Sequence, residues 1–379
     1  MAASVRGGTT SSVDATAESR HRRAGNDEDM LDEAYDRLHL TGPEFRGWLP
    51  NHGPMAVDAL LRLGGADLVA DWVTRYARRL EPLPAARWPI TEPEWREPLG
   101  DPSRMGDWLA FFARALADEP WQEVLCRWWP RLLPGALAAA THGIIRTGHA
   151  VRALRVRVSA PRTAELAHAL GYWAARWQQL RQPGQLRGRL SCSEALAAVP
   201  SLPRPGGFRT RVAAVEHSER FQQALRQLDS RHTVGVLPHA MSTLIDSAVS
   251  AYFAWSHAHP VMLVHIASAP RAAALVLPSI PRDQWEDTYH TAWVMAATVA
   301  AAYRPGDSSP RDQARAHQEA GETDPESVVA AALHHQDEHV LELVDVACES
   351  HRRGSRLALP AARRAITLIN RPRSGAETS

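Results

Sequence analysis

The chain has 379 residues, of which 45% are hydrophobic, so it is long enough to bury a large core. Its 43 lysine-or-arginine positions, all of them arginine, and its 42 acidic residues leave a formal charge of +1. This balance gives no overall field that would attract nucleic acid or an anionic membrane, and we expect neither as a partner. The absence of lysine also excludes Schiff-base chemistry and a Walker-type phosphate site.

The spacing of apolar residues predicts an all-α protein. We expect a disordered tail over residues 1–28, one helical domain over 29–370 and a second disordered tail over 371–379. Helices are expected over residues 30–39, 55–63, 67–80, 103–117, 119–129, 130–155, 161–180, 191–199, 208–229, 238–256, 260–268, 283–303, 326–353 and 361–370. No run alternates with period two between turn residues, so no strand is predicted. The expected fold is a single large helical domain with a histidine-rich site between helices.

Cysteine usage and the termini predict a soluble, cytoplasmic protein. The three cysteines are far apart in the sequence and form no CxxC pair, which fits a reducing compartment. The N-terminus lacks the apolar segment of a signal peptide. The most apolar stretch, 260–280, is interrupted by a histidine, a proline and an arginine, and falls short of the ~18 clean residues that a membrane span needs. The sequence does not define an oligomeric state.

Several cofactor-binding and catalytic motifs are missing. No GxGxxG, GxxxxGK[ST], GxSxG or HExxH pattern occurs in the chain. A Rossmann domain for flavin or nicotinamide is therefore not expected, and neither is a flavin cofactor. An oxygenase without a flavin domain would need another way to activate dioxygen, and a metal ion is the simplest alternative.

Histidine is the informative residue, with 18 copies, and the sharpest cluster lies near the C-terminus. His335, His339 and Glu342 are spaced i, i+4, i+7, which would place all three on one face of the helix expected over 326–353. Two imidazoles and a carboxylate on one face suit Fe(II) or Zn(II). The alternative interpretation is a polar, solvated helix face.

Other histidines occur in segments predicted to be buried. His142 and His149 share one face of an apolar helix, and the two glycines between them suggest the close approach of another backbone or of a ligand. His265 lies inside an apolar helix, where an unpaired imidazole is costly, so it needs a partner. His257 lies at the preceding helix junction. Taken singly, His52 and His290 are more typical of core histidines than of ligands.

Five short motifs, with His265, carry a resemblance to a known family. They are Asn51-His52-Gly53-Pro54-Met55-Ala56, Gly106-Asp107-Trp108, Trp128-Trp129-Pro130-Arg131-Leu132-Leu133-Pro134-Gly135, Thr141-His142-Gly143 and Asp337-Glu338-His339. Together they resemble the questin oxidase-like family, which is also described as Baeyer–Villiger oxidase-like. The resemblance runs from about residue 30 to residue 350.

The resemblance implies a monooxygenase or dioxygenase of secondary metabolism that inserts oxygen into, or cleaves, an aromatic polyketide or anthraquinone-type ring. Some members resemble non-haem Fe(II) enzymes that hold the metal with four histidines and a carboxylated lysine. On this sequence the implied histidine ligands are His52, His142, His265 and His339. The lysine position falls on Glu342, which keeps a carboxylate but on a shorter stem.

The remaining implied partners and roles follow from that ligand set. Dioxygen and a small aromatic or quinone substrate are the expected partners. His335 and His149 are expected to orient ligands or transfer protons as catalytic residues, and His257 and His290 to line the substrate pocket. The family's association with NADPH has no binding fingerprint in this chain.

Two other functions fit the same residues. A zinc-dependent hydrolase would use the same histidines with three or four ligands and without oxygen. A non-catalytic helical protein would use them as core residues or to bind a ligand. Bound metal and oxygen consumption separate these alternatives.

Overall fold

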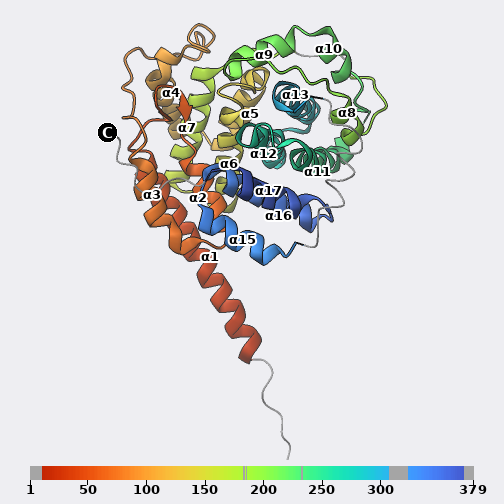
Figure 1. Ribbon diagram of the computed structural model, residues 1–379. Coiled ribbons are helices and arrows are strands. Elements are labelled where there is room, and N and C mark those ends of the chain that lie inside the picture. Colours follow the sequence, from red (N-terminus) through yellow and green to blue (C-terminus); the bar gives the residue numbers. More distant parts are fainter. Residues whose placement is uncertain (1–10, 182–183, 185, 232–233, 307–322, 371–379) are drawn as a thin grey trace, which may run out of the picture.

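The computed structural model describes residues 11–181, 184, 186–231, 234–306 and 323–370, with side chains from residue 24 onward except at residue 234. Its elements are almost all helices, which confirms the predicted all-α class (Figure 1). Within the described residues the only sheet is a pair of two-residue strands. The C-terminal tail expected over 371–379 lies outside the described residues, as do residues 1–10 of the N-terminal one.

The N-terminal third leads from a long helix through a small hairpin to the first histidine. Its elements are α1 (Ser11–Leu38), β1 (Glu44–Phe45), β2 (Leu49–Pro50), α2 (Gly53–Arg62), η1 (Ala66–Leu68) and α3 (Val69–Ala77). Helix α1 begins well before the expected position at Met30, so it extends back into the segment for which we expected a disordered tail. The strands pair antiparallel, Phe45 opposite Leu49. The hairpin thereby delivers the chain directly to His52, the residue that precedes α2.

The middle of the chain is a series of helices with a short 3-10 turn before α4 and another after α5. The elements are η2 (Pro102–Arg104), α4 (Met105–Asp118), α5 (Trp121–Leu132), η3 (Leu133–Gly135), α6 (His142–Val156), α7 (Ala160–Arg176), α8 (Cys192–Ala198), α9 (Phe208–Glu216) and α10 (Glu219–Leu225). The single helix expected over 130–155 is wrong, because the helical pattern is interrupted between η3 and α6. Helix α8 begins with a capping box between Ser191 and Glu194.

The C-terminal part carries the longest buried helices. Its elements are η4 (Val234–Val236), α11 (Leu237–Trp255), α12 (Pro260–Val276), η5 (Leu277–Ser279), η6 (Arg282–Gln284), α13 (Trp285–Tyr303), α15 (Pro325–His335), α16 (Glu338–Arg352) and α17 (Ala358–Leu368). The single helix expected over 326–353 is also wrong. Gln336 adopts a left-handed conformation with φ 63°, and Asp337 then caps a new helix, α16.

Helix α12 is the centre of the fold and is in contact with α6, α11, α13 and α16. Residues Pro260–Ser279 are long and apolar enough to cross a membrane by composition, but 72% of that apolar window is buried inside the protein. The segment therefore has the character of the core helix of a packed domain.

Close approach of α6 to α12 depends on Gly148. A Cβ atom at this position would lie 2.6 Å from the carbonyl oxygen of Ala272, so no larger residue fits without moving one helix. This confirms the close approach expected from the two glycines of α6. The absence of a side chain at Gly148 also lets the helix that carries His142 pack directly against the helix that carries His265.

The turn that enters α6 is strained. Ala139, Ala140 and Thr141 are consecutive and all have positive φ, at 48°, 56° and 73°. None is a glycine, and each left-handed residue with a Cβ costs roughly 1–2 kcal/mol. The very next residue is His142, so the strain is located where the chain aims an imidazole into the protein interior.

We predict that Ala140→Gly raises the free energy of unfolding by about 1 kcal/mol, because glycine adopts positive φ without a Cβ clash. Denaturant unfolding measures the change. The matched control is Ala150→Gly, in the middle of α6, which should lower stability by about 1 kcal/mol. A loss of stability for Ala140→Gly comparable to that of the control would contradict the strained turn.

Candidate metal centre

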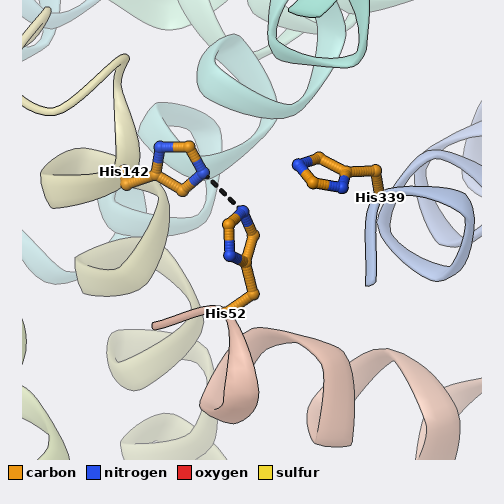
Figure 2. Close-up of side chains that lie close together, drawn as sticks. All are labelled: His52, His142 and His339. Carbon is orange, nitrogen blue, oxygen red and sulfur yellow. Dashed lines mark hydrogen bonds between the residues drawn. The ribbon is translucent and has the colours of Figure 1, made fainter. Parts of the chain in front are cut away.

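Four histidines, three of them in helices and one just before a helix, lie together inside the protein. His52 precedes α2, His142 is the first residue of α6, His265 lies in α12 and His339 is the second residue of α16. The Nε2 atoms of His142 and His52 are 2.7 Å apart, and those of His142 and His265 are 3.2 Å apart. Figure 2 shows His52, His142 and His339 pointing toward one another from three helices.

His339 closes the group on the side of α16. Its ring centroid is 4.7 Å from that of His52 and 5.9 Å from that of His265. One ligand nitrogen from each of His52, His142 and His339 lies within 4.8 Å of the others. Neighbouring nitrogen ligands of a metal with bonds of about 2.1 Å lie on the order of 3 Å apart, which matches the 2.7 and 3.2 Å that separate Nε2 of His142 from those of His52 and His265.

Three of the imidazoles are oriented by backbone carbonyls of their own segments. The Nδ1 atoms of His52, His142 and His265 lie 2.7, 2.6 and 3.0 Å from the carbonyl oxygens of Pro50, Ala139 and Met262. A carbonyl oxygen can only accept, so each Nδ1 carries the proton and donates it. In a neutral imidazole Nε2 then bears a lone pair, and these lone pairs point into the centre.

Burial keeps these imidazoles neutral. Desolvation, together with the neighbouring histidines, lowers the pKa values of His52 and His142 well below the usual range and lowers the pKa of His265 to about 3. A proton shared between two Nε2 atoms is therefore disfavoured. Lone pairs that face each other at 2.7 Å repel unless a cation lies between them, and a bound metal ion removes that repulsion.

His339 differs because an acid supports it. Asp337 accepts hydrogen bonds from the backbone N–H groups of His339 and Val340, and its Oδ1 lies 3.5 Å from Nδ1 of His339. Burial alone lowers the pKa of His339, but the carboxylates of Asp337, and to a smaller extent Glu338, raise it above the usual value. Carboxylate–histidine pairs of this kind orient and strengthen metal ligands.

Glu342 follows His339 by one helical turn and is 97% buried. Burial raises the pKa of its carboxyl to about 7, while the nearby His339 opposes that rise. Its Oε1 atom has no hydrogen-bond partner in the described part of the chain. A buried carboxyl oxygen that accepts no hydrogen bond is costly. Such a group, one helical turn from His339, is suited to a cation.

The two expected catalytic histidines lie elsewhere. His335 ends α15, on the other side of the break at Gln336, and its Nε2 donates to the carbonyl oxygen of Ile369 at 3.0 Å. His335 therefore does not share a helix face with His339 and Glu342, as the i, i+4, i+7 spacing predicted, because it lies in α15 and they lie in α16. His149 donates from Nδ1 to Asp58 at 2.8 Å, and its Nε2 faces Arg271.

The two expected substrate-binding histidines are also outside the group. His257 is exposed in the turn after α11. His290 lies half-buried on α13, with Nε2 4.0 Å from Glu286. The structure thus brings together His52, His142, His265 and His339, with Glu342 on the same helix as His339, and it places the other four predicted residues away from them.

Two supporting residues escaped the sequence reasoning. The hydroxyl of Tyr76 accepts a hydrogen bond from the backbone N–H of His52 at 2.7 Å, and Nε1 of Trp72 donates to the carbonyl of Gln336 at 3.0 Å. Both lie within the helix expected over 67–80, but the spacing of apolar residues reveals burial and not a hydrogen-bonding partner. Asp337 did carry a signal, because aspartate before an acidic first turn is typical of a helix N-terminus.

Comparison with known proteins agrees with the motifs. A protein-family model described as questin oxidase-like matches residues 49–346, which is more than half of the chain and includes all four histidines and Glu342. No curated protein matched the sequence. The chain belongs to the questin oxidase-like family.

Proposed function

We propose that the protein is a non-haem Fe(II)-dependent oxygenase that inserts oxygen into, or cleaves, an aromatic polyketide ring of the anthraquinone type. Membership in the questin oxidase-like family supports an oxidase or oxygenase. The observation that carries the iron proposal is the meeting of neutral Nε2 lone pairs at 2.7 and 3.2 Å in a buried place. A folded protein tolerates that arrangement most easily when a metal ion occupies it.

In this proposal His52, His142, His265 and His339 hold the iron. Four imidazoles and one carboxylate would suit a divalent ion of borderline softness and would leave about one position for dioxygen or substrate. A bound Fe(II) supplies the one-electron chemistry that lets dioxygen react with an aromatic ring. The carbonyl bonds at Nδ1 hold each ring so that Nε2 faces inward, and Asp337 does the same for His339.

We assign Glu342 the place of the family's carboxylated lysine. A pKa of about 7 means that the carboxyl changes its charge readily, and a nearby divalent cation favours the ionised form. The stem of glutamate is shorter than that of a carboxylated lysine. Glu342 therefore ligates directly only if α16 approaches the metal closely, and otherwise acts through a water molecule.

The helix ends favour an anionic substrate. Helices α2, α6 and α16 all begin at the histidine group, so the positive ends of three helix dipoles point toward it. A phenolate oxygen of a hydroxyquinone is stabilised in such a field. The proposed substrate class is therefore a small polycyclic phenol or quinone.

The proposed setting is cytoplasmic, with dioxygen as the second substrate and with neither nucleic acid nor membrane as a partner.

The number of oxygen atoms that enter the ring determines whether the reaction needs a reductant. Incorporation of one oxygen atom into the ring requires two electrons from an external donor such as NADPH, with the second atom leaving as water. Incorporation of both atoms requires none.

We predict that anaerobic loading gives stoichiometric Fe(II), and that the loaded protein then consumes oxygen with a hydroxyanthraquinone probe. His142→Ala should weaken iron binding more than about a hundredfold and abolish oxygen uptake, because it removes the nitrogen nearest to two others. The control His351→Ala changes an exposed histidine of α16 and should leave both unchanged. Oxygen uptake that does not depend on iron, or preferential zinc binding with hydrolysis, would contradict the proposal.

A second prediction concerns the carboxylate. Glu342→Gln should weaken Fe(II) binding by about tenfold while the protein stays folded, because it removes a negative charge without a change in shape. The control is Asp107→Asn on α4, an equally buried carboxylate held by Arg104. Anaerobic equilibrium dialysis measures the affinity of each variant. Equal affinity in wild type and Glu342→Gln would remove Glu342 from the ligand set.

A further inference from the structure

A second buried layer of polar residues lies on the helices that carry the four histidines. Six or seven residues after each histidine comes a titratable residue: Asp58 follows His52, His149 follows His142, Arg271 follows His265 and Asp345 follows His339. At 1.5 Å per residue this layer lies about 9 Å further along each helix. Arg62, Arg152 and Glu349 complete it, each ten residues after a histidine.

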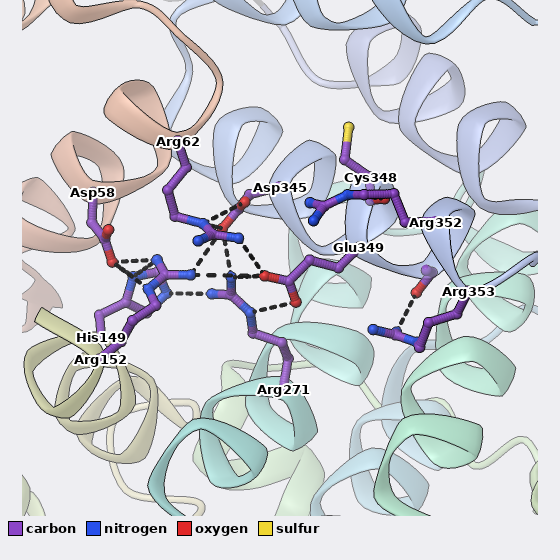
Figure 3. Close-up of polar contacts among 11 residues, drawn as sticks. Asp58, Arg62, His149, Arg152, Arg271, Asp345, Cys348, Glu349, Arg352 and Arg353 are labelled. Carbon is purple, nitrogen blue, oxygen red and sulfur yellow. Dashed lines mark hydrogen bonds and ion pairs between the residues drawn. The ribbon is translucent and has the colours of Figure 1, made fainter. Parts of the chain in front are cut away.

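These seven residues, here called the ion-pair layer, form one connected network (Figure 3). Arg271 lies at its centre. Its Nη2 donates to Asp345 and Glu349, at 2.7 Å each, and its Nη1 lies 3.3 Å from Nε2 of His149. Arg271 thereby joins α12 to α16 and to α6.

The network reaches α2 through two further arginines. Nε of Arg62 donates to Asp345 at 2.9 Å, and Arg152 donates from Nε to Asp58 at 3.0 Å and from Nη1 to Asp345 at 3.3 Å. His149 donates to the same carboxylate of Asp58. All four histidine-bearing helices are thus linked through side chains.

The ion-pair layer is internally balanced. Three arginines face three carboxylates, and Arg271, Asp345, Asp58 and His149 are all at least 90% buried. Such a network has no net charge to attract a ligand, so we do not interpret it as a binding site. Its guanidinium–carboxylate contacts are directional, however, and they resist sliding of one helix along another in a way that apolar contacts do not.

The histidine layer needs such support. Each of the three Nδ1–carbonyl bonds stays within its own segment. These bonds fix how a ring sits on its helix, but they do not fix the distance between helices. A displacement of 1 Å between ligands is enough to disturb a metal site.

We infer that the ion-pair layer is a positioning device that sets the relative height of α2, α6, α12 and α16, and so determines where the four Nε2 atoms meet. The inference rests on the proposed metal site. Arg271 and His149 act through the helices and touch neither metal nor substrate.

The test uses Co(II) alone as the probe, because its visible absorption reports on ligand number and geometry. Arg271→Lys keeps the charge but loses the multiple directed contacts, and His149→Gln removes the bridge between Asp58 and Arg271 without changing the number of arginines or carboxylates. Both should weaken Co(II) binding by about tenfold and alter its visible spectrum, measured below the melting temperature of each variant.

The matched control is Arg162→Lys on α7. Arg162 is also fully buried and pairs with Asp32 and Glu28, but α7 carries none of the four histidines. This variant should lower the melting temperature and leave Co(II) affinity and spectrum unchanged. Wild-type spectra and affinities in both Arg271→Lys and His149→Gln would overturn the positioning role alone. A wild-type protein that binds no Co(II) would instead contradict the metal site itself.

Discussion

Imidazole lone pairs that face one another in a buried place are the constraint on which the rest of this structure depends. Each Nδ1 of His52, His142 and His265 is committed to a carbonyl oxygen, so the facing Nε2 atoms cannot form ordinary hydrogen bonds with one another without giving up those contacts. Desolvation opposes the alternative, a buried imidazolium. Without a cation the arrangement is electrostatically unfavourable, and its cost must be met by packing elsewhere.

The helices around the histidines offset this cost by close packing. The core helix α12 is held against α6 at Gly148 and against α16, and the turn before His142 stores backbone strain in three left-handed residues. The same helices carry two polar layers. The histidines face one another in the first layer, and in the second the ion pairs around Arg271 link the helices to one another. The backbone strain before His142 persists only because the packed surroundings hold the chain in that conformation.

Much of the fold and of the site can be predicted from the sequence, because the periodicity of apolar residues indicates which side chains are buried. The all-α class, the apolar setting of His142 and His265 and the close approach at Gly148 are readable from residue types and spacing. The break at Gln336 was missed because Glu326 to Arg353 reads as one continuous pattern, although Asp337 offered a helix-start signal. The positive φ of Ala139 and Ala140 could not be predicted, since alanine has no preference for that conformation. The contacts of His149 and His335 depend on partners about 90 and 34 residues away in the sequence, which no local pattern reveals.

X-ray absorption spectroscopy on the anaerobic Fe(II)-loaded protein tests the central claim most directly. The account predicts a first shell of light ligands at about 2.1 Å, with the multiple scattering that several imidazole rings produce, and much less bound iron in His142→Ala loaded in the same way. An iron shell made of oxygen ligands alone, or no bound iron after anaerobic loading, would contradict the claim that these lone pairs converge on a metal.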